Sequence, residues 1–458
     1  MKTFHYTLVL MLFVFAIPLS SQTTYWVPVK GIPKTSDVLS LFVTPDGTIF
    51  TGLYDHDVYR STNNGMNWQN VHWGPAFSFA SNHFGTVFFG STQSSNMITL
   101  IYFSTDNGTT WDGGSIWEGS VYSVLPLSLT DVLCCTEYNL YKTTNPINRW
   151  SNLNFPIDTV RFRVLAQDSL GFVLLGTKNA GIFISIDSGL NWNQAFSTIN
   201  GCTGITDLTV LGLKYYFAST ENNGIFRGTY FGNELEQCNT GLPTLKTYSL
   251  TYTLDSTLYV GTDKGVYQST DFGTTWQSFS TSLPPSTFIR KIASSPSGAL
   301  YAGTVNKGLY KTQQLPKYFK GWNLVSLPFT VPDQNITALF PTASSHAFMY
   351  DTSYIEKIEL TKGHGYWIKF DSTTPALYTG SPISEDTINI KKGWNLIGSI
   401  STPVPVDSLV HTPSEMNFSG FYQFQPGIGY SPTVTLSPGY GYWVKSDIDG
   451  QVIISSKF

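Results

Sequence analysis

Between Ser40 and Thr312 the chain alternates short apolar runs with polar turns at a regular interval. Each unit has an apolar run that ends near a glycine, a short polar turn, and a run in which apolar and polar residues alternate. The segments "TIFTGLYDHDVYRST" from Thr48 and "TLYVGTDKGVYQST" from Thr257 are two examples. Alternation with a period of two predicts half-buried strands, and the glycine-rich and asparagine-rich stretches predict turns. The pattern therefore favours many short strands over long helices.

A tryptophan closes most of these units and gives the length of the repeat. These tryptophans lie about 42 residues apart, and one interval is twice that length, so one unit has lost its tryptophan: Trp26, Trp68, Trp111, Trp150, Trp192 and Trp276. Four short strands in about 42 residues are typical of a β-propeller blade. Seven units fit between Ser40 and Thr312. We therefore predict an all-β, seven-bladed β-propeller over residues 22–315.

The seventh unit ends near Thr312 without a fourth strand of its own. The segment "TYWVPVKGIP" (Thr24–Pro33) resembles the fourth-strand segment "TWQSFSTSLP" (Thr275–Pro284). We predict that this N-terminal strand completes the last blade, closes the ring and covers the sheet edges that an open ring would expose.

After Thr312 the pattern changes to a tandem duplication. The first copy has "KGWNLVSLPF" and "KGHGYWIKF", and the second has "KGWNLIGSI" and "PGYGYWVKS". We predict a duplicated β-sandwich-like domain over residues 316–458, with units of about 319–390 and 391–458. The duplication resembles a repeat that is common in large secreted proteins of Bacteroidota-like bacteria.

The duplicated segments are rich in aromatic residues, which allow two interpretations. The residues are Trp322, Tyr366, Trp367, Trp394, Tyr442 and Trp443. They could stack on sugars, or they could form the cores of two small β-units. The glycine turns before them and the alternating strands after them favour the core. Whether this domain binds a ligand or only spaces the propeller from the cell stays open.

The N-terminus has the pattern of a secretory signal peptide. Lys2 supplies a positive charge, residues 7–17 are almost wholly apolar, and small residues follow at Ser20 and Ser21. This order predicts a signal peptide over 1–21 with cleavage after Ser21. The apolar run is short for a membrane span, which needs about 20 residues. We expect a secreted or cell-surface protein with no membrane span in the mature chain.

Composition narrows the classes of partner. Charged residues make up 12% of the chain, the net charge is −4, and no basic run is present, so we expect no nucleic-acid partner. Cys134 and Cys135 lie in an apolar strand pattern and are expected to be free buried thiols. A disulfide between Cys202 and Cys238 stays open. The scattered histidines have no metal-ligand spacing, and we expect no metal and no cofactor.

The turn before the tryptophan follows the pattern Ser-x-Asp-x-Gly-x-x-Trp. It occurs in full as "STDNGTTW", "SIDSGLNW" and "STDFGTTW", and with asparagine for aspartate as "STNNGMNW". It resembles the Asp-box, or BNR, repeat of sialidases, sortilin-like receptors, two-propeller xyloglucanases and photosystem II assembly-factor-like propellers. The resemblance implies a turn between the third and fourth strands of a blade, on the face opposite to the usual ligand site.

The chemistry of this turn indicates a structural role. Aspartate and asparagine accept hydrogen bonds from backbone amides in turns, glycine permits a positive φ, and tryptophan fills the space between sheets. We therefore expect no catalysis from the Asp-box residues Asn63, Asp106, Asp187, Asp271, Trp68, Trp111, Trp192 and Trp276.

A candidate ligand site comes from aligning the blades. One position near the start of each innermost strand holds Leu39, Phe77, Tyr122, Arg163, Thr206, Tyr248 and Arg290. Aromatic residues and arginine are enriched at recognition sites. Our candidate ligand-binding residues are therefore Phe77, Tyr122, Arg163, Tyr248 and Arg290. The alternative is that these side chains only pack against neighbouring blades or solvate the rim.

We expect a monomeric, non-catalytic binding protein whose partner is an extracellular polysaccharide or protein. The alternative is a glycoside hydrolase, for which the candidate acids on the same face are Asp55, Asp57, Glu137, Asp207 and Glu221. Hydrolysis needs two carboxyl groups about 5–10 Å apart. The arginine cluster of a sialidase is missing, and we assign no catalytic residue. A weaker alternative is an assembly factor, which needs a basic patch.

Overall fold

The computed structural model describes residues 24–33, 36–54, 57–92, 99–116, 119–145, 150–153, 155–196, 204–212, 215–229, 235–376 and 380–456. Apart from one short α-helix, α1 (Ile336–Leu339), and a 3-10 turn, η2 (Val406–Ser408), the regular structure of these residues is β-strand. The prediction of an all-β fold is confirmed. The predicted signal peptide lies outside the described residues. No helix in the described ranges has the length and apolar character that a membrane crossing requires.

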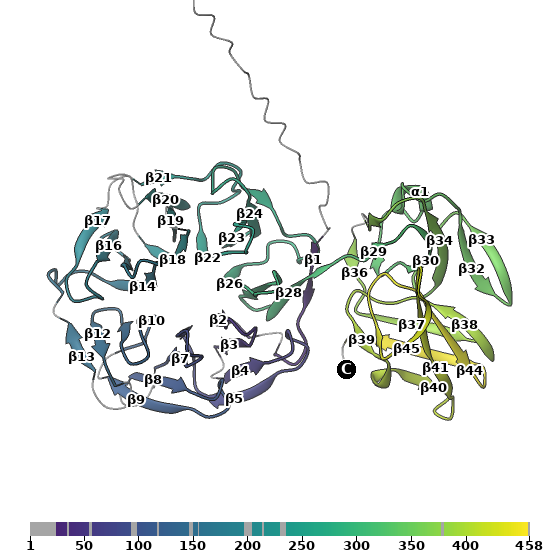
Figure 1. Cartoon of the computed structure of the whole chain (residues 1–458), viewed down its shortest axis with the longest axis horizontal. Coiled ribbons are helices and arrows are strands. Elements are labelled where there is room, and N and C mark those ends of the chain that lie inside the picture. Colours follow the sequence, from purple (N-terminus) through teal and green to yellow (C-terminus); the bar gives the residue numbers. More distant parts are fainter. Residues whose placement is uncertain are drawn as a thin grey trace, which may run out of the picture.

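The described residues between Thr24 and Gln314 form seven four-stranded antiparallel sheets arranged in a ring (Figure 1). From the innermost strand outwards, the first three sheets are β2 (Val38–Val43), β3 (Ile49–Leu53), β4 (Asp57–Ser61) and β5 (Gln69–Trp73); β6 (Ser78–Ser81), β7 (Val87–Gly90), β8 (Thr99–Ser104) and β9 (Asp112–Ile116); and β10 (Ser123–Pro126), β11 (Val132–Cys135), β12 (Leu140–Thr143) and β13 (Ser151–Leu153). The next two are β14 (Phe162–Gln167), β15 (Val173–Thr177), β16 (Ile182–Ser185) and β17 (Asn193–Phe196); and β18 (Ile205–Leu211), β19 (Tyr215–Thr220), β20 (Ile225–Thr229) and β21 (Glu236–Gln237). The last two are β22 (Thr247–Tyr252), β23 (Leu258–Thr262), β24 (Gly265–Ser269) and β25 (Gln277–Ser278); and β26 (Ile289–Ser294), β27 (Leu300–Thr304), β28 (Leu309–Gln314) and β1 (Thr24–Pro28).

Strand β1 comes from the N-terminal end of the chain, whereas its three sheet partners come from residues 289–314. It pairs antiparallel with β28, with Trp26 opposite Thr312. The same sheet packs against the first sheet of the ring, because Gly303 of β27 lies against Val38 of β2. A Cβ atom at Gly303 would fall 2.3 Å from Val38 Cγ1, so only glycine allows this approach.

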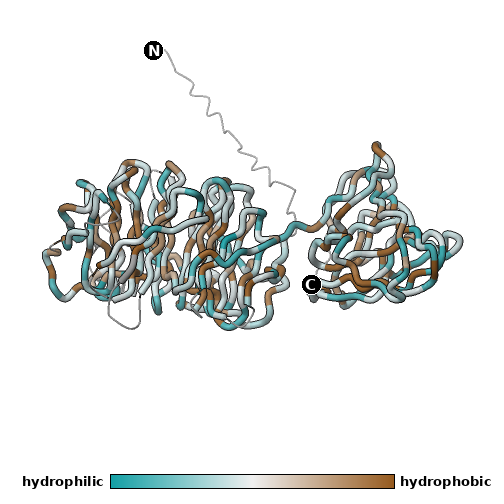
Figure 2. Tube along the Cα trace, turned by 90° about the horizontal axis from the view of Figure 1, so that it is seen from below, coloured by the Kyte–Doolittle hydropathy of each residue, from teal (hydrophilic) through white to brown (hydrophobic). Residues whose placement is uncertain are grey.

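Hydrophobic side chains fill the spaces between neighbouring sheets. One such cluster joins Leu133 and Leu140 of the third sheet to Phe162, Leu175 and Phe183 of the fourth, and all five are buried. Each sheet thus buries both of its faces, which explains why the second strands are apolar at consecutive positions rather than alternating. Figure 2 shows these apolar segments running through the ring.

Residues after 316 form a second set of sheets beside the ring (Figures 1 and 2). The two main sheets are β30 (Gly321–Ser326), β34 (Gly365–Phe370), β32 (Ala347–Asp351) and β33 (Ser353–Lys357), and β38 (Gly393–Ile397), β44 (Tyr442–Ser446), β41 (Phe418–Gln425) and β42 (Gly429–Thr433). The smaller sheets are β37 (Glu385–Ile390), β45 (Gly450–Ser455) and β40 (Val410–Thr412); β29 (Lys317–Tyr318) and β35 (Thr374–Pro375); β31 (Phe329–Thr330) and β36 (Ser381–Pro382); and β39 (Val404–Pro405) and β43 (Thr435–Leu436). The two main sheets have the same order of equivalent strands, as the duplicated sequence requires. We refer to these residues as the C-terminal domain.

Candidate functional site

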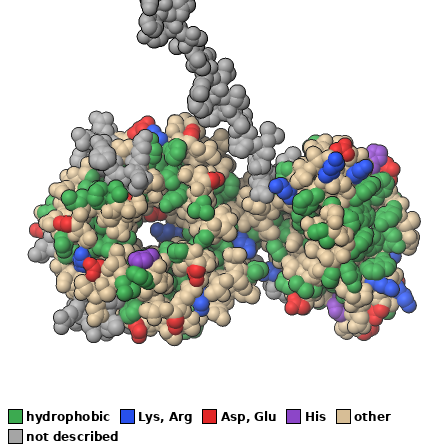
Figure 3. Space-filling view, in the orientation of Figure 1, with side chains coloured by type: hydrophobic (Ala, Val, Ile, Leu, Met, Phe, Trp, Pro, Cys, Tyr) green, Lys and Arg blue, Asp and Glu red, His purple; other side chains and the backbone are tan. Residues whose placement is uncertain are grey.

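The innermost strands of the seven sheets surround a central cavity of about 740 Å³. Figure 3 shows the ring hollowed at its centre. Backbone and side chains of β2, β6, β10, β22 and β26 line much of the cavity, and Phe77 and Tyr122 lie among the lining residues. The cavity is therefore a candidate ligand site of this ring.

The position singled out by aligning the blades is a β-bulge in five of the seven innermost strands described. In β14, for example, Phe162 pairs with Thr177 and Val164 pairs with Gly176, so Arg163 has no opposite residue. The same shift in register leaves four more residues without an opposite residue on the second strand: Leu39, Thr206, Tyr248 and Arg290. Bulges of this kind re-aim a side chain and are common beside functional sites.

Phe77 and Tyr122 occupy the equivalent place just before β6 and β10. Their amides donate to Gly90 O at 2.8 Å and to Cys135 O at 2.9 Å. All seven aligned residues thus lie at the same end of the innermost strands. We call this set of seven the channel mouth: Leu39, Phe77, Tyr122, Arg163, Thr206, Tyr248 and Arg290.

At three blades the residue after the aligned position accepts a hydrogen bond from the next blade. Ser123 Oγ accepts from the amide of Leu165 at 3.1 Å, and Asp207 Oδ2 accepts from the amide of Leu250 at 2.9 Å. Ser249 Oγ repeats the bond to the amide of Ile292 at 3.2 Å. These bonds run between neighbouring innermost strands, so they fix three pairs of those strands relative to each other.

One side of the channel mouth carries an arginine stacked on an aromatic ring. The guanidinium carbon of Arg163 lies 4.4 Å from the ring centroid of Tyr122, within the range of a cation–π contact. Beside them, Arg161 is bonded to Glu137 Oε1 at 2.9 Å and to the Tyr138 hydroxyl at 3.3 Å. The hydrogen bond to Glu137 raises the pKa of Arg161. The structure thus brings Tyr122 and Arg163 of neighbouring blades together, a contact that fits both a recognition site and packing between blades.

The other side of the mouth is built on Tyr248 and Arg290. The Tyr248 ring lies 4.4 Å from the ring of Phe288, and Arg290 is ion-paired with Asp37 at 3.2 Å. Burial raises the pKa of Tyr248, and the carboxylates of Asp263 and Glu221 raise it further, whereas Arg290 lowers it. These charged groups therefore share one small region with the Tyr248 hydroxyl.

Two polar atoms in this region have no hydrogen-bond partner among the described residues. They are Arg290 Nε and Asp263 Oδ1, and both are buried. A buried polar atom without a partner is costly unless water or a ligand satisfies it. The alignment of blades could not find Asp263, Asp37 or Phe288, because they lie outside the recurring position.

The candidate acids of the hydrolase alternative are mostly engaged in structural contacts. Asp207 accepts from the Ser249 hydroxyl and the Leu250 amide, both at 2.9 Å, and Glu137 is paired with Arg161. Asp57 Oδ2 accepts from the Tyr59 hydroxyl at 3.3 Å. Asp55 lies outside the described residues.

The Ser-x-Asp turns lie at the opposite end of the sheets, between the third and fourth strands. In each turn the Oδ1 atom accepts from the serine hydroxyl two residues earlier and from the amide four residues later. For Asp187 these distances are 2.8 Å from Ser185 and 2.8 Å from Asn191. The equivalent pairs occur at Asn63, Asp106 and Asp271.

The tryptophans of these turns contribute to packing. The indole nitrogens of Trp68 and Trp192 donate to the glycine carbonyl three residues earlier, at 3.2 and 3.0 Å. Trp276 donates to Cys238 O of the preceding sheet at 2.8 Å, and Trp111 packs against Phe50 of the preceding sheet. Each turn therefore connects two sheets.

The same end of the ring holds two arginines that bond to the next turn along. Arg60 donates to Thr109 Oγ1 at 3.3 Å, and Arg227 donates to Phe272 O at 2.7 Å. These two arginines are thus far from the channel mouth, which makes them useful as matched controls for Arg163 and Arg290.

Metal and thiol chemistry receives no support from the described residues. Within them no group of three or more His, Cys, Asp or Glu side chains could hold a metal ion. Cys134 and Cys135 are buried free thiols, as expected, and burial raises the pKa of Cys135 to about 12. The disulfide considered for Cys238 involves Cys202, which lies outside the described residues.

The aromatic residues of the C-terminal domain divide into two groups. The core interpretation is right for Tyr366 and Tyr442, which are 1% and 0% exposed. It is wrong for Trp322 and Trp394, which are 41% and 46% exposed. The sequence alternation gives the residues that share a face of a strand, but it does not tell which face is covered.

Comparison with solved structures identifies the ring as a β-propeller. A structure of YCF48 bound to a D1 peptide superposes with a TM-score of 0.52 at 13% identity, over 64% of this chain and 96% of that chain. Virginiamycin B lyase from Staphylococcus aureus superposes with a TM-score of 0.53 at 11% identity, over 64% and 99%. The WD40 propeller domain of Doa1 gives 0.50 at 13% identity, over 62% and 96%.

At these identities the likeness shows the fold alone, so the class of the ring is settled and its function is not. No protein-family model matches the chain, and no curated protein matches its sequence.

Proposed function

We propose that the chain is an exported, non-catalytic binding protein built on a seven-bladed Asp-box propeller that strand β1 closes. Its ligand, a polysaccharide or a protein segment, binds at the channel mouth. Phe77, Tyr122, Arg163, Tyr248 and Arg290 make the contacts. A peptide ligand has a parallel in YCF48, whose similar structure is bound to a D1 peptide.

The observation that carries this proposal is the repeated bulge. A bulge at the same place in five innermost strands gathers Leu39, Arg163, Thr206, Tyr248 and Arg290 at one end of those strands, and bulges of this kind are common beside functional sites. The buried and unpartnered atoms of Arg290 and Asp263 are at that end, where a ligand could satisfy them. A catalytic role has less support, because Glu137 and Asp207 are already bound to neighbouring groups.

The test is a binding screen of the chain from Gln22 onwards against an immobilised glycan array and a displayed peptide library. The variant R163A/R290A should lose binding to at least one class of hit, and the matched control R60A/R227A should keep binding to all of them. Arg227 lies in the sheet next to that of Arg163, and Arg60 lies in the sheet next to that of Arg290, so the comparison isolates the end of the ring on which each pair lies. Unchanged binding in a folded R163A/R290A protein contradicts the proposal.

Release of reducing sugar from each glycan hit is measured in the same screen. Binding without release supports a non-catalytic role. Binding with release would make the protein a glycoside hydrolase, and the carboxylates near the mouth, including Glu221 and Asp263, would then be the residues to replace.

A further inference from the structure

The duplication of the C-terminal domain has preserved a pair of tryptophans in each unit. In the first unit the rings of Trp322 (β30) and Trp367 (β34) lie 6.5 Å apart at an interplanar angle of 86°. In the second unit Trp394 (β38) and Trp443 (β44) lie 6.1 Å apart at 90°. The nearly equal geometry means that both sheets present the same edge-to-face pair.

Each of these pairs is completed by a ring from the other unit. Tyr350 of β32 lies 4.8 Å from Trp443 at 69°, and Phe424 of β41 lies 4.7 Å from Trp367 at 74°. The two sheets therefore share one continuous aromatic surface. We call it the aromatic face, and it consists of Trp322, Phe348, Tyr350, Tyr354, Trp367, Trp394, Tyr422, Phe424, Tyr430 and Trp443.

Several rings of the aromatic face are open to solvent. Trp322 and Trp394 are 41% and 46% exposed, and Tyr354 and Tyr430 are 56% and 55% exposed. In Figure 3 hydrophobic side chains gather over the C-terminal domain. Soluble proteins rarely leave large aromatic side chains together at the surface unless they bind something there.

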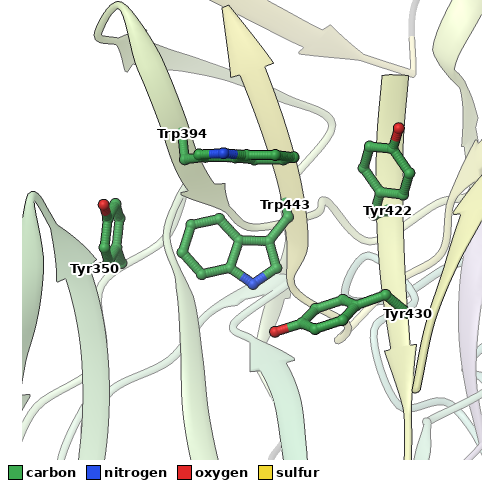
Figure 4. A pocket seen from close by; sticks show the side chains of 5 residues that line it. All are labelled: Tyr350, Trp394, Tyr422, Tyr430 and Trp443. Atoms are coloured by element: carbon green, nitrogen blue, oxygen red, sulfur yellow. The ribbon is translucent and has the colours of Figure 1, made fainter. Parts of the chain in front are cut away.

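A pocket of about 430 Å³ opens on the aromatic face. Its lining is wholly aromatic: Tyr350, Trp394, Tyr422, Tyr430 and Trp443. Figure 4 shows Trp443 in the middle, with the other rings arranged around it and the Tyr430 hydroxyl pointing towards the Trp443 indole. The volume of this open pocket is within the range of small-ligand sites, about 300–1,000 Å³.

The charges around the pocket argue for a neutral ligand. No charged side chain is among the lining residues. Lys445 Nζ lies 6.0 Å from the ring centroid of Trp394, so a cation already occupies the neighbourhood of that ring. A second cation, such as a quaternary ammonium group, would be repelled there.

The remaining chemistry matches a sugar. A pyranose ring has a flat apolar face of C–H groups and an edge of hydroxyls. The aromatic face offers ring faces for the first, and tyrosine hydroxyls for the second.

We propose that the aromatic face is a second binding site, which takes a neutral polysaccharide by stacking sugar rings on Trp394 and Trp322. This proposal is independent of the channel mouth, because it uses different residues in a different domain.

The experiment is affinity electrophoresis of the chain from Gln22 onwards in gels that contain hydroxyethylcellulose, xylan or galactomannan. Titration with cellohexaose, xylohexaose and mannohexaose follows. We expect retardation by at least one polysaccharide, and W394A and W322A should each lower the affinity about tenfold, the loss of one stacking contact. Trp394→Phe, which keeps a ring, should lose less.

Trp73→Ala is the matched control, since Trp73 is 81% exposed on β5 of the propeller and should not affect binding. Melting curves of all variants separate lost binding from lost folding. The exposed tryptophans are chosen because Trp443 is buried and its replacement would disturb the core.

Three results would overturn the proposal. The first is no retardation by any of the three polysaccharides, and the second is equal retardation of the wild type and a folded W322A/W394A protein. The third is binding to phosphatidylcholine or phosphatidylglycerol vesicles in place of sugar. Loss of sugar binding in R163A/R290A, with W322A/W394A unaffected, would assign the sugar to the channel mouth instead.

Discussion

Tyr25 and Trp26 are neighbours on strand β1, yet their side chains enter two different hydrophobic cores. Trp26 is 1% exposed, packs with Tyr259 and Ile289 of the last two sheets of the ring, and donates from its indole nitrogen to Phe279 O at 2.6 Å. Tyr25 points the other way, contacts Phe329 at 4.7 Å and donates to Ser401 O at 3.1 Å. Successive residues of a strand face opposite sides, so one short strand joins the ring to the C-terminal domain.

The first prediction concerns these two residues. Trp26→Ala should destabilise the propeller by about 3–5 kcal/mol, because it empties a fully buried site between sheets. Tyr25→Ala should instead lower the stability of the C-terminal domain. Differential scanning calorimetry, with each domain assigned to its transition, measures the two effects separately.

A more conservative substitution at Tyr25 tests the contribution of its hydroxyl group to the C-terminal domain. Tyr25→Phe keeps the ring and removes the hydroxyl that donates to Ser401 O, for an expected loss of about 1 kcal/mol. If Trp26→Ala and Tyr25→Ala lowered the same transition equally, the division of β1 between two cores would be wrong.

The second prediction tests how tightly the Ser-x-Asp turn packs on the preceding sheet. Gly108 has a φ of +77°, and a Cβ atom there would lie 2.4 Å from Phe50 Cε1. Gly47 has a similar φ of +88° but nothing within 4 Å. Gly47→Ala should cost about 1–2 kcal/mol of unfolding free energy for its backbone conformation. Gly108→Ala should cost a further ~1–3 kcal/mol for overpacking.

Urea denaturation of the two variants gives these free energies. Equal losses would mean that Phe50 moves aside and that the turn does not hold the blade in place.

The parts of the structure that the sequence predicts well depend on local patterns. The apolar run ending in glycine and the Ser-x-Asp turn lie within one blade, so their 42-residue repeat is enough to predict the strands. The bulge at Arg163 was not predictable, because it is a property of the register between β14 and β15. The solvent exposure of Trp394 could not be predicted either, because the sequence of one duplicated unit does not show how the two main sheets pack against each other.

The third prediction is a loss of stability in acid. The amide and side chain of Asn191, with the Ser185 hydroxyl, hold the pKa of Asp187 at about 2. This folded-state value is below the usual aspartate pKa of about 3.9, so the stabilisation is present above about pH 4 and is lost as the pH falls towards 2. Hydrogen bonds from the Thr110 hydroxyl and amide lower the pKa of Asp106 in the same way.

The natural Asn63 supplies the design of the test. Its neutral Oδ1 still accepts from the Asn67 amide at 2.9 Å, so Asp187→Asn should fold. We expect the melting temperature of this variant to be below that of the wild type at pH 7. The difference between the two melting temperatures should be smaller at pH 2.5. The reverse change, Asn63→Asp, should raise the melting temperature at pH 7 and lose that gain over the same pH range. A gap that is constant with pH would contradict the prediction.

The last prediction separates structure from catalysis at Asp207. Its Oδ2 atom accepts from the Ser249 hydroxyl and the Leu250 amide, and the equivalent position of other blades holds serine, as at Ser123 and Ser249. Asp207→Ala leaves the buried Leu250 amide without its acceptor and should cost about 1–3 kcal/mol of unfolding free energy. Asp207→Ser keeps a hydroxyl at the place where other blades use one, so it should recover most of that loss. Chemical denaturation measures the unfolding free energy of both variants.

If Asp207 were a catalytic acid or base, Asp207→Ser would instead abolish reducing-sugar release while the protein stayed folded. A stable Asp207→Ser protein whose ligand binding and reducing-sugar release both equal those of the wild type therefore assigns Asp207 to the bonds between neighbouring innermost strands.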